Sequence, residues 1–268
     1  MKSIACVILL AALLLPAGLV LGQDPAAKKE PLPEVIRRML AEGDSYRALE
    51  FIQSLGEPKK VVALYGALAE IYARKENDLA KSALLARAGI QFALTEAQRI
   101  DGKDVEGATS LRAQAKTIAY NLAANTWPGW GEEGVEPTDE QIAIGWDAAK
   151  LNLRLAVALE KGPVKEAHAY WILGAHELAA RQYEAAADSF KTAAAKAREG
   201  KDHAAELMAG GYRAVALIVA EDTPENRAAL ESAKAALTQR AADGDEDAGF
   251  YLPQLDTALA IFLERRER

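Results

Sequence analysis

Residues 167–193 read "AHAYWILGAHELAARQYEAAADSFKTA" and carry the strongest evidence for the fold class of this chain. Alanine is abundant, runs of β-branched residues are missing, and the apolar residues recur at spacings of three and four. Such spacing places apolar side chains on one face of an α-helix. The stretch therefore predicts two helices, 164–180 and 183–198, joined by a short turn and packed antiparallel.

The same spacing continues over most of the chain, and no alternation of apolar and polar residues competes with it. Helix boundaries are marked by capping residues such as Thr138 with Gln141, and Thr223 before Pro224. These features predict an all-α fold. The helices are expected near 33–42, 45–55, 58–74, 78–99, 104–124, 139–161, 164–180, 183–198, 202–220, 224–242 and 253–266.

Residues 167–193 resemble one tetratricopeptide repeat (TPR), a two-helix unit of ~34 residues. The positions that match, and that the resemblance assigns to packing within the repeat, are Tyr170, Leu173, Gly174, Tyr183, Ala186, Phe190 and Ala193. Small residues allow the paired helices to approach closely, and the larger ones fill the gaps around that contact. Arg181 stands where the family often has a turn glycine. The resemblance implies a right-handed TPR-like solenoid of antiparallel helix pairs; an irregular α-bundle is the alternative.

Residues 125–137, "NTWPGWGEEGVEP", interrupt the helical pattern with two tryptophans around a Pro-Gly turn. In a solenoid of helix pairs this segment, here called the tryptophan loop, is an insertion, and insertions often map to a binding face. We expect Trp127 to be buried against the ends of helices 104–124 and 139–161. We expect Trp130 to be more exposed at the turn.

The first residues, "MKSIACVILLAALLLPAGLVLG", have the pattern of a secretory signal peptide. Lys2 is followed by an apolar stretch and by small residues before a cleavage site near Gly22. This pattern predicts an exported protein, periplasmic or extracellular, with no membrane span after cleavage. The alternative is an uncleaved membrane anchor.

The domain organisation expected from these features has three parts. They are a signal peptide at 1–22, a flexible tether at 23–33 and a TPR-like α-helical domain at 34–268. The only cysteine, Cys6, would be lost with the signal peptide, which leaves no disulfide or thiolate site. A formal net charge of −7 disfavours nucleic acid as a partner, and short basic clusters such as Arg265-Arg266 are explained by a solvated face.

Catalytic and metal-binding motifs are missing from the sequence. His176 begins "HELAA", which departs from the zinc motif HExxH because Ala180 occupies the second ligand position. Residues 243–254, "DGDEDAGFYLPQ", lack the turn glycine and the last glutamate of a calcium loop. They are interpreted as an acidic connector before the last helix. We therefore predict no catalytic residue, no metal ligand and no cofactor.

The resemblance also implies a peptide-facing surface, lined by the first helix of each repeat. With the tryptophan loop added, the candidate partner-binding residues are Trp127, Trp130, His168, Trp171, Ala175, Leu178, Tyr212 and Arg213. Most are apolar, which favours contact with a partner helix or strand over the family's clamp for a peptide carboxylate. Burial in the core is the alternative for Trp171.

Three functions remain open at this stage. The favoured one is an exported, non-catalytic TPR-like scaffold that binds a protein or peptide partner in the cell envelope. A carbohydrate- or cell-wall-binding module would need Trp127 and Trp130 exposed and coplanar. An α-helical hydrolase would need a closed acidic cavity with paired carboxylates.

Overall fold

The computed structural model describes residues 31–267. All regular secondary structure in this part of the chain is helical, and it has no strand. The all-α prediction is therefore confirmed. The elements are α1 (Leu32–Ala41), α2 (Ser45–Gln53), α3 (Pro58–Arg74), α4 (Leu79–Ile100), α5 (Val105–Asn125), the 3-10 turn η1 (Pro128–Trp130), α6 (Asp139–Ala158), α7 (Pro163–Ala179), α8 (Tyr183–Glu199), α9 (His203–Ala220), α10 (Pro224–Ala242) and α11 (Glu246–Glu267).

The chain divides into two compact units, with the boundary between Ile52 and Gln53. The sequence analysis expected one TPR-like domain over 34–268. The described part of the first unit holds α1 and most of α2, with a turn at Gly43, whose φ is +83°. The second unit holds α3 to α11 and the candidate site. The predicted signal peptide lies outside the described residues, as does most of the predicted tether. None of the described helices is both long and apolar enough to cross a membrane.

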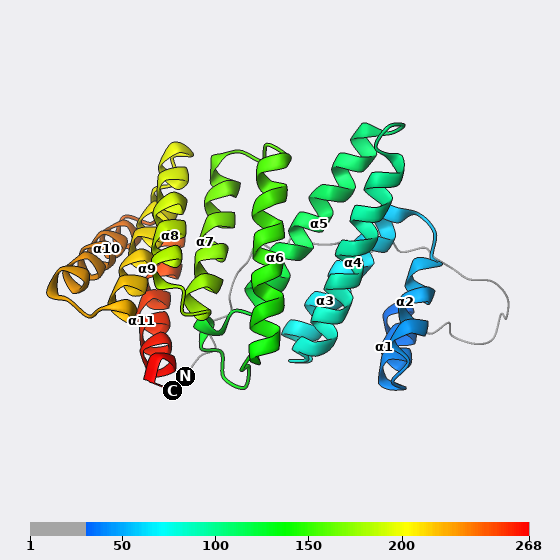
Figure 1. The fold of residues 1–268 in the computed structure, drawn as a ribbon, viewed down its shortest axis with the longest axis horizontal. Coiled ribbons are helices and arrows are strands. Elements are labelled where there is room, and N and C mark those ends of the chain that lie inside the picture. The colour runs from blue at the N-terminus through cyan, green and yellow to red at the C-terminus, as the bar shows by residue number, and fades with distance from the viewer. Residues whose placement is uncertain (1–30, 268) are drawn as a thin grey trace. The chain divides into compact units, whose positions relative to one another are not determined.

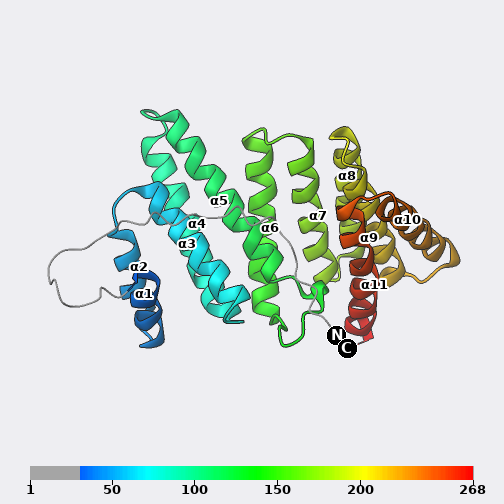
Figure 2. The same ribbon diagram turned by 180° about the vertical axis from the view of Figure 1, so that it is seen from behind.

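Helices in the second unit pack in the order of the sequence. From α3 onward each helix contacts the next one along the chain, as Figures 1 and 2 show from opposite sides. The odd-numbered helices α3, α5, α7, α9 and α11 also contact one another in turn. They form a layer in which side chains far apart in the sequence can meet.

Two predicted helix caps are confirmed. The Thr138 hydroxyl accepts from the Gln141 N–H at 3.3 Å, and the Gln141 side chain accepts from the Thr138 N–H at 2.9 Å. This is a capping box, which satisfies two N–H groups that the start of α6 would leave unpaired. The Thr223 hydroxyl likewise accepts from the Asn226 N–H at 3.2 Å, with Pro224 at the first helical position.

Four of the turns between helices share one backbone geometry. Two residues after the end of the preceding helix, each turn has a residue with positive φ: Glu160, Arg181, Lys201 or Gly244. In each turn that residue donates its N–H to the carbonyl three residues back, and the next residue donates to the carbonyl five residues back. This pair of bonds is the Schellman motif. Arg181 therefore occupies the backbone conformation that favours glycine, with φ of +60°.

The prediction for the last helix was wrong at its start. It begins at Glu246, not near 253, so most of the predicted acidic connector is helix. Asp245 caps this helix by accepting from the Ala248 N–H at 3.1 Å, and this bond and Arg240 lower the pKa of the Asp245 carboxyl. Pro253 lies inside the helix with its ring exposed, while Ala248 and Leu255 on either side are fully buried. Burial of these side chains outweighs the ~3 kcal/mol that an interior proline costs.

The residues that the resemblance assigned to packing lie between α7 and α8. Gly174, Ala186, Phe190 and Ala193 are buried, whereas Tyr170, Leu173 and Tyr183 are half-buried. A Cβ added to Gly174 would meet the Phe190 ring at 3.0 Å and the Ser189 Cβ at 3.1 Å. The contact of the two helices at Gly174 therefore leaves no room for a larger side chain.

Gly174→Leu should lower the free energy of unfolding by ~1–3 kcal/mol or more, because it overpacks the contact between α7 and α8. Chemical denaturation followed by circular dichroism measures this. Gly210→Ala on α9 is the matched control, since a Cβ there meets nothing within 4 Å. It should stabilise by about 0.5–1 kcal/mol. Equal effects of the two variants would contradict close packing at Gly174.

Candidate functional site

Trp127 lies at the centre of a group of aromatic side chains. It is 1% exposed, and its indole N–H donates to the Ala175 carbonyl of α7 at 2.9 Å. Its ring lies 5.7 Å from Trp171, 5.8 Å from Tyr212 and 6.0 Å from Phe262, measured between centroids. These residues and Trp130 are called the aromatic cluster. Burial of Trp127 is confirmed, and its aromatic neighbours lie on α7, α9 and α11 and in the loop itself, which the sequence did not predict.

Trp130 is more exposed than Trp127, as the sequence predicted. It is half-buried, and its indole N–H donates to the Ala124 carbonyl at 2.7 Å. Its ring lies 4.8 Å from that of Trp127 at an interplanar angle of 89°. The two rings therefore do not form the exposed, coplanar pair that stacking on a sugar would require.

The tryptophan loop continues from Trp130 against α11. Gly131 has a φ of +62°, and a Cβ there would meet Thr257 at 2.9 Å and Ile261 at 3.1 Å. Glycine at this position provides both the left-handed backbone and the space for the loop to approach the helix. The loop that follows α5 therefore packs against α11, which is far away in the sequence.

His176 of α7 contacts the last turn of α5, directly before the tryptophan loop. It is fully buried, and its Nε2–H donates to the Ala123 carbonyl at 2.8 Å. Burial lowers its pKa to about 4, against the smaller opposing influence of the Ala123 and Ile142 carbonyls. A Cβ at Gly145 would collide with Thr126 and His176, so α6 can approach this point only with glycine.

The other predicted partner-binding residues are mostly covered by the chain itself. Trp171, Ala175, Leu178 and Tyr212 are buried. His168 is half-buried, and Arg213 is exposed. Leu178 lines the pocket described next, whereas direct contact between a partner and Trp171, Ala175 or Tyr212 would require the segments that cover them to move.

A cavity of about 280 Å³ lies beside the aromatic cluster, where the ends of α7 and α11 meet the starts of α6 and α8. It is called the arginine pocket. Its lining residues are Asp139, Leu178, Ala179, Ala180, Arg181, Tyr183, Phe262, Arg265 and Arg266. Phe262 belongs to both the pocket and the aromatic cluster, so the packing of Trp127 helps to form the pocket wall.

The three arginines of the pocket are anchored by backbone carbonyls or by a weak ion pair. Arg181 donates to the Arg265 carbonyl at 2.7 Å, and Arg266 donates to the Val219 carbonyl at 2.8 Å. The Arg265 guanidinium lies 3.6 Å from a carboxylate oxygen of Asp139, whose side chain is fully exposed. A guanidinium has five N–H donors, so these bonds use few of them. With Asp139 counted, the pocket lining has a net formal charge of +2.

The sequence analysis missed this pocket because it attributed Arg265-Arg266 to a solvated face. The available signal was Arg181, an arginine at a turn position that favours glycine. Its connection to Arg265, 84 residues away, has no trace in local sequence patterns.

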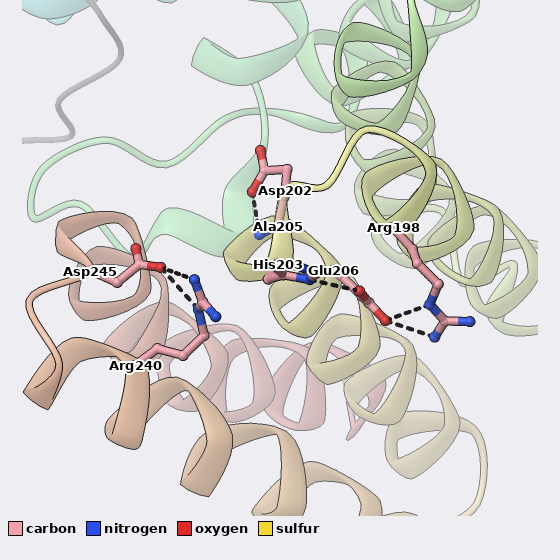
Figure 3. A network of polar contacts seen from close by, with 7 residues as sticks. All are labelled: Arg198, Asp202, His203, Ala205, Glu206, Arg240 and Asp245. Carbon is pink, nitrogen blue, oxygen red and sulfur yellow. Dashed lines mark hydrogen bonds and ion pairs between the residues drawn. The ribbon is translucent and has the colours of Figure 1, made fainter.

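A network of polar side chains near the α8–α9 and α10–α11 turns is a second candidate (Figure 3). Asp202 accepts from the Ala205 N–H at 3.0 Å as the cap of α9. Glu206 pairs with Arg198 at 2.7 Å, and Arg240 pairs with Asp245 at 2.7 Å. Each carboxylate is thus already used by a helix start or a neighbouring base. The network stabilises turns, and it does not by itself point to a ligand.

Buried ionisable groups form a third candidate. Burial and nearby Lys165 and Lys161 lower the pKa of Lys116 to about 8, and burial lowers the pKa of His168. The His168 Nε2 makes no hydrogen bond within the described part of the chain. Over residues 31–267, no three His, Cys, Asp or Glu side chains are arranged to hold a metal ion.

Comparison with known proteins gives no family for this chain. No family model matches it, and no curated protein matches it.

Trp127→Ala should destabilise the fold by ~3–5 kcal/mol, as expected when a large core aromatic is truncated. The variant also loses the hydrogen bond to Ala175. Trp130→Ala should cost less, about 1–2 kcal/mol, because it removes one hydrogen bond and a half-buried ring. Thermal and chemical denaturation of both variants measure this. A larger loss for Trp130→Ala than for Trp127→Ala would show that the cluster is not centred on Trp127.

His176 should make the fold less stable in acid. Its folded pKa of about 4 lies below its ordinary value of 6.5, so the unfolded chain binds the proton more tightly. Stability from this group is present above pH 6.5 and is lost as the pH falls toward 4, by up to ~1.4 kcal/mol per pH unit. His176→Gln retains a donor for Ala123 and should remove this slope. His203→Gln, which replaces an exposed histidine, should keep it. Denaturant titrations at pH 7.5, 6 and 5 test both variants.

Proposed function

We propose that this chain is a TPR-like solenoid of right-handed, antiparallel helix pairs that acts as a non-catalytic scaffold for a protein or peptide partner. Three features support the solenoid. Consecutive helices pack in sequence order, the odd-numbered helices form one layer, and four turns share the same Schellman geometry. Repetition of one helix–turn unit produces such features in repeat proteins.

The arginine pocket is the observation that carries the binding proposal. Its volume of about 280 Å³ lies below the usual ~300–1,000 Å³ of small-molecule sites. That space suits one side chain or chain end of a larger partner. Apolar residues and arginines line it together, which is the combination found at hot spots of protein interfaces.

The compartment we propose is the cell envelope. This rests on the charged start, the apolar stretch and the small residues of the predicted signal peptide. A net charge of −7 over the whole chain makes the concentration of arginines in the pocket a local feature.

The alternative functions lack a comparable feature. A glycan platform would use Trp127 and Trp130, but one ring is buried and the two are perpendicular. A hydrolase would use paired carboxylates, whereas Asp139 is the one carboxylate that lines the arginine pocket.

Site-specific photocrosslinking in cells tests the proposed function. Tyr183 of the pocket is replaced with p-benzoylphenylalanine, and Ala229, exposed on α10, receives the same probe as the control. We expect a discrete crosslinked protein from position 183 and none from position 229. Thermal melts verify that both variants fold. Identical crosslinking patterns at the two positions, or no crosslinked protein at position 183, would contradict a partner at this pocket.

A further inference from the structure

We propose that the arginine pocket is a binding site for a carboxylate carried on an apolar stem. This inference rests on the same pocket as the proposed function. It does not require the ligand to be a protein, because the chemistry of the pocket selects the chemical group and not its source.

Three arginines line this cavity, and arginine favours an oxygen anion. Arginine binds carboxylates through paired N–H donors, and such charge-assisted bonds are stronger than neutral ones. Asp139, the carboxylate already present, is fully exposed and lies 3.6 Å from Arg265, beyond hydrogen-bond distance. An incoming carboxylate could therefore displace this contact at little energetic cost.

The remainder of the lining selects what is attached to the anion. Leu178, Ala179, Ala180 and Phe262 provide an apolar surface next to the guanidiniums. An apolar stem packed there would gain free energy from burial, whereas a fully hydrated ion would not. The pocket therefore combines one charged and one apolar recognition element.

Local electrostatics favour a single negative charge over a phosphate dianion. The C-terminal ends of α7 and α11 carry partial negative charge, and the starts of α6 and α8 at the same pocket carry partial positive charge, so the helix ends largely cancel. Asp139 adds a full negative charge. Attraction to the net positive lining doubles for a dianion, whereas the cost of removing an ion from water rises with the square of its charge, so the balance favours the monoanion.

Arg181 has a backbone geometry that provides a matched test. Arg181 and Lys201 both have φ of +60° in equivalent Schellman turns, where glycine is favoured. Only Arg181 lines the pocket. Replacing either with glycine should relieve the same backbone strain, and Arg181→Gly also removes the exposed hydrogen bond to the Arg265 carbonyl, so melting and affinity are both compared between the two variants.

Titration with small probes tests the chemical class of the ligand. Hexanoate, hexanamide and hexyl phosphate share one stem and differ in the head group. Binding is measured by chemical-shift changes of the full-length protein and by calorimetry. Hexanoate should bind at least tenfold more tightly than either other probe, and more weakly as salt is added. Equal affinity for hexanamide, or tighter binding of hexyl phosphate, would overturn the proposal.

Variants test the location of the site. Arg181→Gly should lower hexanoate affinity by fivefold or more with a melting temperature at or above that of the native chain. Lys201→Gly should have the same effect on melting with unchanged affinity. Arg265→Gln should lower affinity about tenfold relative to the control Arg87→Gln, which removes an exposed arginine on α4, outside the pocket. Asp139→Asn should raise affinity several-fold. Equal affinities for all five proteins and the native chain would place binding elsewhere and overturn the proposal.

The source of the carboxylate is resolved with peptides. Acetyl-Gly-Gly-Leu is compared as the free acid and as the C-terminal amide, alongside amidated acetyl-Gly-Glu-Gly. Preference for the free acid identifies a chain end, and binding of the glutamate peptide identifies an acidic side chain; both support the site. Hexanoate binding with no peptide binding supports the carboxylate site and argues against a peptide partner. Crosslinking at position 183 without hexanoate binding would support a protein partner and overturn the carboxylate site.

Discussion

The indole of Trp127 is the contact on which the second unit depends. It enters the space between α7, α9 and α11 from a loop, and its N–H satisfies the carbonyl of Ala175 inside α7. A buried donor without an acceptor would be costly, so the loop has one favourable position and register. Through this single side chain, the loop after α5 contacts α7, α9 and α11, and Phe262 of α11 lies more than a hundred residues further along the chain.

Local patterns were sufficient to predict the helices of this chain. Apolar spacing located them, and side-chain caps at Thr138 and Thr223 fixed where two of them start. The failure at α11 shows the limit of this reasoning. Pro253 normally ends a helix, but Leu255 and Ala248 are buried by α9 and α10, and the sequence alone does not contain that contact.

The candidate site was harder to predict because its residues meet only in the folded chain. Burial of Trp127 followed from the residue type and from its place before Pro128, whereas its aromatic neighbours did not. Arg181, Arg265 and Arg266 come from a turn and from the end of the last helix, and each alone resembles an ordinary surface arginine. Tertiary proximity, not residue type, gives them a shared role.

Three of the four tryptophans of the chain lie within 6 Å of one another, in one cluster that spans the loop and α7. Indoles this close exchange excitation energy and couple their electronic transitions. The fourth, Trp146, lies apart beneath the ammonium of Lys150, 3.9 Å from its ring. Emission and near-ultraviolet dichroism of the native protein are therefore dominated by the docked loop, which gives the molecule an intrinsic optical reporter of whether that loop is in place.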